Sequence, residues 1–193
     1  MSKLEEYSKK RDFNKTNEPQ GEEEKSDKNI FVIQKHDASN LHYDLRLEID
    51  GTLKSWVVPK GPSTDPSVKR LALPTEDHPL KYADFEGLIP EENYGAGTVI
   101  VWDKGTFENT TEKDKEMINA AEALRVGHIT FDLQGEKLQG RYSLFRTNKG
   151  KNERWLLVKM KDDYADARRN PTSTENKSVI SGKTIEELKK EEN

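Results

Sequence analysis

One stretch places residues that bind ions at the spacing of a β-strand. Over residues 41–49, apolar and polar side chains alternate without a break. Successive side chains of a strand point to opposite faces, so His42, Asp44 and Arg46 share one face and the apolar residues share the other. An imidazole, a carboxylate and a guanidinium on one face can converge on a metal ion or a phosphate group. We therefore expect one face of this strand to pack and the other to do chemistry.

A second histidine offers another ligand, because His36 follows the preceding apolar run at residues 30–33. Two histidines and one carboxylate form a recurrent metal-binding set, which His36, His42 and Asp44 would provide. An exposed strand face is normally polar, so a solvated face is the alternative. Such faces are mostly lysine, glutamate, threonine and serine. Two of the four histidines in the chain fall in this short region, which favours a metal or phosphate site while leaving the alternative open.

The composition limits the partners and the ligands. The chain has 193 residues, of which 32% are hydrophobic and 35% charged, so we expect one domain with polar appendages. Basic and acidic residues nearly balance, at a formal net charge of -4, and any contact with nucleic acid should therefore be local. Cysteine is absent. Metal ligands must then be histidine or carboxylate, and the composition fits a reducing cytoplasm.

Further classes of protein are excluded by local pattern. No apolar run approaches the roughly 20 residues of a membrane span, and the first residues lack the apolar stretch of a signal peptide. Gly95 and Gly97 precede a strand pattern rather than a helix, which argues against a dinucleotide-binding loop. We expect a cytoplasmic protein without a membrane segment. A monomer is the default, because no long apolar edge demands a partner.

Hydrophobic patterning predicts a mainly β fold. Strands are expected over residues 30–35, 41–49, 52–58, 68–73, 98–107, 128–133, 138–146 and 154–160. Asp50-Gly51 is a strong hairpin signal between two of them. Short strands with hairpin turns imply a small antiparallel β-barrel with one or two flanking helices, in which the three tryptophans pack. One core helix is expected over residues 113–126, where apolar residues recur near helical spacing.

We divide the chain into three parts. Residues 1–29 form a polar, acidic N-terminal leader, a composition that by itself predicts disorder. Residues 30–168 carry the strand patterns and form the β-barrel domain. Residues 169–193 form a C-terminal tail, for which we expect disorder or loose docking.

Motifs are spread over nearly the whole chain. They comprise residues 34–46, 56–62, 69–72, 76–82 and 94–103, with Lys10-Arg11-Asp12-Phe13, Thr16, Glu18 and Pro19 in the leader. Together they resemble the 3′-phosphoesterase module of bacterial DNA ligase D and its free-standing archaeal and bacterial relatives. That family cleans 3′ ends at DNA breaks. It removes a terminal ribonucleoside and then the 3′-phosphate, and leaves the 3′-hydroxyl that a polymerase or ligase requires.

The resemblance implies a role for each residue that matches a motif. The metal ligands would be His36, His42 and Asp44. The scissile phosphate would be held by Arg46 and His78. Further residues around it or supporting the site would be Lys60, Arg70, Tyr82, Gln34 and Glu76. The leader would contribute Arg11, Asp12 and Glu18. This last implication places residues 1–29 folded against the active site, contrary to what their composition predicts.

The resemblance also implies the cofactor and the partners. The metal would be divalent and typically manganese, with other transition metals such as cobalt also suitable. The substrate would be a DNA 3′ end, and a DNA ligase or polymerase would act in trans. His78 could hold a phosphate oxygen or donate a proton to the leaving oxygen, since an imidazole titrates near neutrality. The sequence does not choose between these two roles.

Two rival functions remain. His42 and Asp44 with the distant His128 imitate the facial triad of a non-haem iron oxygenase, although His128 lies outside the motifs and we expect it to be structural. An oxygenase, however, has no need for Lys60 and Arg70 in the same cluster. The other rival is a catalytically silent module that binds DNA ends with the same cations. Retention of the whole metal set argues against it.

Overall fold

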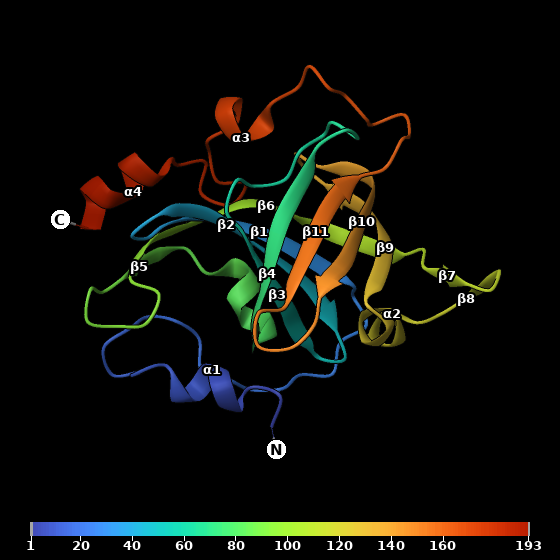
Figure 1. Ribbon diagram of the computed structural model, residues 1–193. Coiled ribbons are helices and arrows are strands. Elements are labelled where there is room, and N and C mark those ends of the chain that lie inside the picture. Colours follow the sequence, from blue (N-terminus) through green and yellow to red (C-terminus); the bar gives the residue numbers. More distant parts are fainter. Residues whose placement is uncertain (1, 193) are drawn as a thin grey trace.

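Eight antiparallel strands close into a barrel in the computed structural model, which describes residues 2–192 (Figure 1). In order around the barrel they are β1 (Ile30–Asp37), β2 (Leu41–Ile49), β3 (Thr52–Val58), β4 (Lys69–His78), β11 (Arg154–Lys159), β10 (Gln139–Asn148), β9 (His128–Gly135) and β6 (Gly97–Asn109). Pairing of β6 with β1 closes the barrel, and β5 (Gly87–Ile89) pairs with β6. The expected mainly β barrel is confirmed.

Short helices flank the barrel. They are α1 (Glu5–Lys9), the 3-10 helix η1 (Leu80–Asp84), α2 (Ala120–Val126), α3 (Pro171–Thr174) and α4 (Ile185–Glu192). No helix within residues 2–192 is long and apolar enough to cross a membrane.

The helix expected over residues 113–126 is wrong in its first half. Residues there form a separate hairpin of β7 (Glu112–Lys113) and β8 (Glu116–Met117), and Met117 is 59% exposed. The two residues that join these strands both have positive φ, which a helix does not allow. The helix begins only after Asn119, whose side chain accepts a hydrogen bond from the backbone N–H of Glu122. Such a cap satisfies an N–H that the first turn leaves unpaired.

Apolar side chains pack on both sides of the barrel wall. The interior contains Trp56, Trp102 and Trp155, all at most 3% exposed, so their expected packing role is confirmed. A second apolar cluster lies against the outer surface of β1 and β6, and it includes Tyr7 from the leader and Tyr82 from η1. The inward positions of β2 belong to the interior cluster. The polar face of β2 therefore looks outward, toward the leader.

The C-terminal tail packs against the barrel, so the expectation of disorder or loose docking is not what the structure shows. The indole N–H of Trp102 donates to the carbonyl oxygen of Glu175, at 2.6 Å. The hydroxyl of Tyr43 donates to the carbonyl oxygen of Thr172, and Ile185 is 3% exposed. Buried aromatic residues of the barrel thus find their hydrogen-bond partners in tail backbone, which apolar periodicity cannot reveal. In Figure 1 the leader runs below the barrel, while α3 lies above it and α4 to its left.

Candidate active site

The pairing of β1 with β2 assembles three candidate metal ligands on the outer face of the barrel. His36 lies directly opposite His42, and Gln34 lies directly opposite Asp44. The alternation of β2 places His42, Asp44 and Arg46 on the same face. As a result the rings of His36 and His42 have centroids 4.8 Å apart.

Ligand atoms of His36, His42 and Asp44 all lie within 4.8 Å of one another. Oδ2 of Asp44 is 3.8 Å from Nδ1 of His36 and 3.7 Å from Nε2 of His42. Nδ1 of His42 lies 2.9 Å from the carbonyl oxygen of Asn40, so an Nδ1–H donates there and leaves Nε2 free to ligate. Nε2 of His36 is buried without a hydrogen-bond partner among residues 2–192. An orphaned imidazole nitrogen, a second free one and a carboxylate fit a divalent cation.

The charges around Asp44 keep this carboxylate ionised. Burial alone would raise the pKa of Asp44, but the Arg46 guanidinium and the two neighbouring imidazoles hold it well below its usual range. Burial lowers the pKa of His42, and Asp44 outweighs this effect so that the net direction is upward. A cation that binds here would therefore compete with a proton for His42.

Arg46 joins the metal set to the rest of the site. Its Nε donates to Oε1 of Gln34 at 2.8 Å, and its Nη1 donates to Oγ of Ser55 at 2.9 Å. Nη1 also lies 3.1 Å from Nδ1 of His78, and Nη2 lies 3.4 Å from Oδ2 of Asp44. The residue is 3% exposed. The guanidinium plane is thus fixed before any ligand arrives.

His78 lies between two guanidinium groups. Its Nδ1 is 2.9 Å from the carbonyl oxygen of Glu76, and its Nε2 is 3.2 Å from Nη2 of Arg11. The tautomer with Nδ1–H satisfies both of these partners, and Nη1 of Arg46 then faces Nδ1 as a second donor. Burial, with the charges of Arg46 and Arg11, holds the pKa of His78 well below its usual range. The imidazole is therefore neutral near pH 7.

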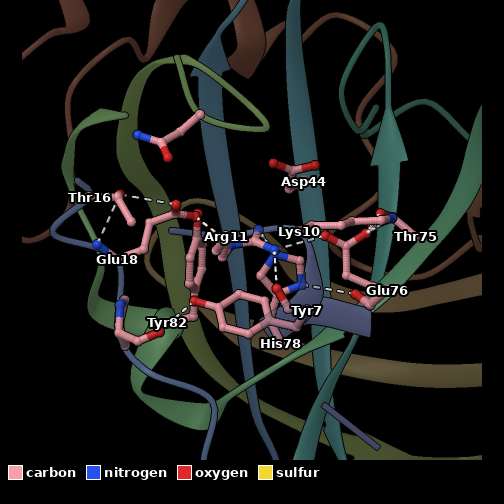
Figure 2. A network of polar contacts seen from close by, with 12 residues as sticks. Tyr7, Lys10, Arg11, Thr16, Glu18, Asp44, Thr75, Glu76, His78 and Tyr82 are labelled. Carbon is pink, nitrogen blue, oxygen red and sulfur yellow. Dashed lines mark hydrogen bonds and ion pairs between the residues drawn. The ribbon is translucent and has the colours of Figure 1, made fainter. Parts of the chain in front are cut away.

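The leader closes one side of this site. Nε of Arg11 donates to Oε1 of Glu18 at 2.9 Å, and Nη1 donates to Oε1 of Glu76 at 3.1 Å. The hydroxyl of Tyr82 donates to the same oxygen of Glu18 at 2.9 Å. Figure 2 shows the side chains of Arg11, Glu18, Glu76 and Tyr82 linked by these contacts, near Asp44. Because the Arg11, Glu18 and Glu76 side chains are at most 4% exposed, each buried charge depends on its partner.

Tyr82 and Gln34 support the site from behind. Burial and then the nearby Glu18 carboxylate raise the pKa of Tyr82 well above its usual range, so its hydroxyl stays protonated and donates. Nε2 of Gln34 donates to the carbonyl oxygens of Tyr82 and Phe85, at 2.9 and 3.1 Å. These bonds orient the amide oxygen of Gln34 toward Arg46.

A cavity of about 280 Å³ is lined both by the candidate metal ligands and by the residues around Arg46 and His78. Of the residues that the sequence indicated, its lining includes His36, His42, Asp44, Arg11, Arg46, Glu76, His78 and Tyr82. Gln34 and Glu18 are buried just behind it and contact its lining. Ten of the candidate residues therefore meet in one place, and they come from the leader, β1, β2, β4 and η1.

Three candidate residues lie outside this cavity. Asp12 is exposed, and its Oδ1 accepts a hydrogen bond from the backbone N–H of Asn14 at 3.1 Å, within a turn of the leader. Lys60 is exposed in the turn after β3. Arg70 pairs with Leu157 of β11, and its Nε is buried without a hydrogen-bond partner in the described chain. The direct roles of these three in the chemistry stay predictions.

Several residues of the site carry no role in the motif analysis. Ser55 is one, although it lies opposite Arg46 in the β2–β3 pairing, and the Asp50-Gly51 turn gives that register from sequence alone. Tyr7 is another, with its ring 5.0 Å from that of His78 and 3.8 Å from the Arg11 guanidinium. A helix of five residues in a polar leader gives no signal for such a contact.

The structure separates His128 from the metal set. This exposed residue lies on β9, and its Nε2 is 2.9 Å from Oγ of Ser143. The histidine that completes the set with His42 and Asp44 is His36. The oxygenase triad built on His128 is therefore wrong.

The fold and the site together define an eight-stranded β-barrel protein with candidate metal ligands and buried cations on the outer face of its wall. The chain belongs to the DNA ligase D 3′-phosphoesterase domain family, whose model matches residues 34–146. The resemblance stated from the motifs is confirmed.

Curated relatives agree with this assignment. The chain is 57% identical over 166 residues to the multifunctional non-homologous end joining protein LigD of Pseudomonas aeruginosa, covering 84% of this chain and 19% of that protein. It is 44% identical over 162 residues to the non-homologous end joining DNA repair protein LigD of Mycobacterium tuberculosis, covering 83% and 20%. The chain thus spans about a fifth of the length of these relatives.

Proposed function

We propose that the protein is a metal-dependent phosphoesterase that heals DNA 3′ ends. It would remove a 3′-terminal ribonucleoside and then the 3′-phosphate, leaving a 3′-hydroxyl. The observation that carries this proposal is the shared guanidinium of Arg46, which contacts the metal ligand Asp44 and the imidazole of His78. Membership of the 3′-phosphoesterase family and the end-joining names of the relatives support DNA ends as the substrate.

The metal set supports a divalent transition ion, and we propose manganese, with cobalt as a substitute. His36, His42 and Asp44 would hold it, since imidazole and carboxylate ligands suit such ions. When bound, the ion would polarise a phosphoryl oxygen and lower the pKa of a coordinated water.

The cationic side chains would hold the phosphate. Arg46 and Arg11 line the cavity with guanidinium groups whose N–H donors match phosphate oxygens. Both are fixed by buried partners, so little reorganisation is needed when charge develops on the transferring group. His78 is neutral in the free protein, which argues against donation of a proton to the leaving oxygen. To hold a phosphate oxygen, it would present Nε2–H in place of the Nδ1–H that donates to the Glu76 carbonyl in the free protein.

The two proposed steps break different bonds at one phosphorus atom. In the first, water attacks the phosphodiester and the bond to the 5′ oxygen of the terminal ribonucleoside breaks. The 5′ oxygen takes up the proton that the water loses, the ribonucleoside leaves, and the strand keeps a 3′-phosphate. In the second, water attacks again and the bond to the 3′ oxygen of the strand breaks. Inorganic phosphate leaves, and the 3′ oxygen gains a proton.

A healed end needs a further enzyme. We propose that a DNA polymerase or ligase takes over the 3′-hydroxyl, and that the chain works as a monomer. We propose that it acts in the cytoplasm.

Phosphate release from defined DNA ends tests the proposal. Duplexes that carry a 3′-phosphate or a single 3′-ribonucleotide are incubated with the protein, with and without manganese. We expect release only with manganese, loss of release in His42→Ala, and normal release in the matched control His128→Ala. Absence of release by the wild type, or equal release by His42→Ala, would reject the proposal. Tight binding of these ends without release would favour the catalytically silent module.

A further inference from the structure

An exposed aromatic ring lies at the edge of the metal cavity. Tyr94 is 52% exposed, and it lines the same cavity as His36 and Asp44. A Cβ placed on the adjacent Gly95 would lie 3.9 Å from Cε1 of His36, which is ordinary contact distance. The chain that carries Tyr94 therefore passes beside a metal ligand, and the ring stands next to the point where a terminal phosphate would bind.

The loop that carries this ring is held in place. The backbone N–H of Asn93 donates to the carbonyl oxygen of Pro90 at 2.9 Å. The backbone N–H of Ala96 donates to the carbonyl oxygen of Asn93 at 3.2 Å. The side-chain amide of Asn93 donates to the carbonyl oxygen of Lys15 in the leader, at 3.4 Å. The ring is thus presented to solvent by an ordered turn. A single exposed aromatic side chain is common on protein surfaces, so only the groups around this ring can indicate a ligand.

Two cations lie near the same ring. Nζ of Lys10 is 4.8 Å from the centroid of the Tyr94 ring, and Cζ of Arg11 is 5.9 Å from it. An aromatic ring beside positive side chains is the combination that sites for single-stranded nucleic acid use, because bases stack on the ring while cations attract the backbone. Here the combination adjoins a cavity that can take a phosphate group.

We propose that Tyr94 is a stacking subsite for the 3′-terminal nucleobase of the DNA strand whose end enters the cavity. The inference rests on the proposed function, because it takes the cavity to be the place of the terminal phosphate. Stacking on the ring makes recognition tolerant of base identity, since every base has an aromatic face. It also sets how far the terminal phosphate reaches toward Asp44.

Binding of matched DNA ends tests the subsite apart from turnover. A labelled single strand ends in a 3′-phosphonate, which has no phosphate ester bond to hydrolyse, and a second strand is identical except that its terminal nucleotide lacks the base. Dissociation constants are measured in manganese by fluorescence anisotropy. For Tyr94→Ala we expect binding of the first strand to weaken about 5- to 150-fold, with binding of the abasic strand unchanged. Tyr94→Phe, which keeps the ring, should restore binding.

Three outcomes would overturn the inference. They are equal binding of the two strands by the wild type, no binding of either, and equal weakening of both by Tyr94→Ala, which would mean that the ring only supports Lys10 and Arg11. Tyr164→Ala is the control, because Tyr164 is 55% exposed and lines a different cavity. Phosphate release from a cleavable 3′-phosphate is measured separately. Its absence with base-dependent binding intact would reject the proposed function and leave the subsite standing.

Discussion

Nη2 of Arg46 lies 3.4 Å from Oδ2 of Asp44. The same guanidinium contacts His78, so one side chain couples the metal set to the residues proposed to bind phosphate. Its charge helps to keep Asp44 ionised and His78 neutral. A single buried cation thus contacts both a candidate metal ligand and a residue proposed to bind phosphate.

Arg46→Lys should abolish most of the activity while the barrel stays folded. The lysine ammonium is a single point charge, and it cannot reach Gln34, Ser55, His78 and Asp44 together as the planar guanidinium does. We expect kcat/KM for release of a 3′-phosphate to fall about 100-fold or more. Thermal unfolding serves as the check on the fold. Activity within a few-fold of the wild type would contradict the role given to the guanidinium.

Arg11→Ala should destabilise the protein strongly, although Arg11 lies in the leader. The substitution leaves the buried carboxylates of Glu18 and Glu76 without their shared cation. The expected loss is about 3–5 kcal/mol in the free energy of unfolding, measured with urea. Arg168→Ala is the control, because the Arg168 side chain is 93% exposed and its removal should change stability by about 0.5 kcal/mol at most. Similar stabilities of the two variants would show that the leader is not held by these pairs.

Glu76 should make stability depend on pH in acid. Burial opposes its ionisation, but hydrogen bonds from the Thr75 hydroxyl and the Lys10 ammonium lower its pKa to about 2 from the ordinary 4.5. A carboxylate whose pKa is lower in the folded state stabilises the protein fully above pH 4.5, and this contribution is lost as the pH falls from 4.5 to 2. We expect Glu76→Gln to be less stable than the wild type by about 2–4 kcal/mol at pH 7.

The difference between Glu76→Gln and the wild type should narrow steadily below pH 4.5, which urea unfolding at several pH values can follow. Glu92→Gln is the matched control, since Glu92 is exposed and pairs only with exposed Lys15 among the described residues. A difference that stays constant from pH 7 to pH 3 would show that the carboxylate acts through its shape and not its charge.

The alternation of residues 41–49 was enough to predict which side chains of β2 share the active face. Period 2 is a property of the strand itself, so it holds whatever the strand packs against. Alternation alone could not place His36 beside these side chains, because its position depends on the β1–β2 register that sets His36 opposite His42. That register is a tertiary fact, although the short connection between the strands made it plausible.

The contacts between the leader and the rest of the site could not be predicted from local sequence pattern. Glu76 and Tyr82 lie more than 60 positions along the chain from their partners Arg11 and Glu18, and no local pattern encodes such contacts. Only the family resemblance placed the leader at the site. The same resemblance grouped Lys60 with the phosphate ligands, whereas the structure leaves it exposed outside the cavity.

The central claim is that His36, His42 and Asp44 bind one divalent ion. Titration with manganese, with the free ion followed by electron paramagnetic resonance, tests it most directly. We expect one ion per chain in the wild type and in His128→Ala, and at least about 100-fold weaker binding in Asp44→Ala and His42→Ala. Wild-type affinity in either of these two variants, or no stoichiometric binding by the wild type, would contradict the account.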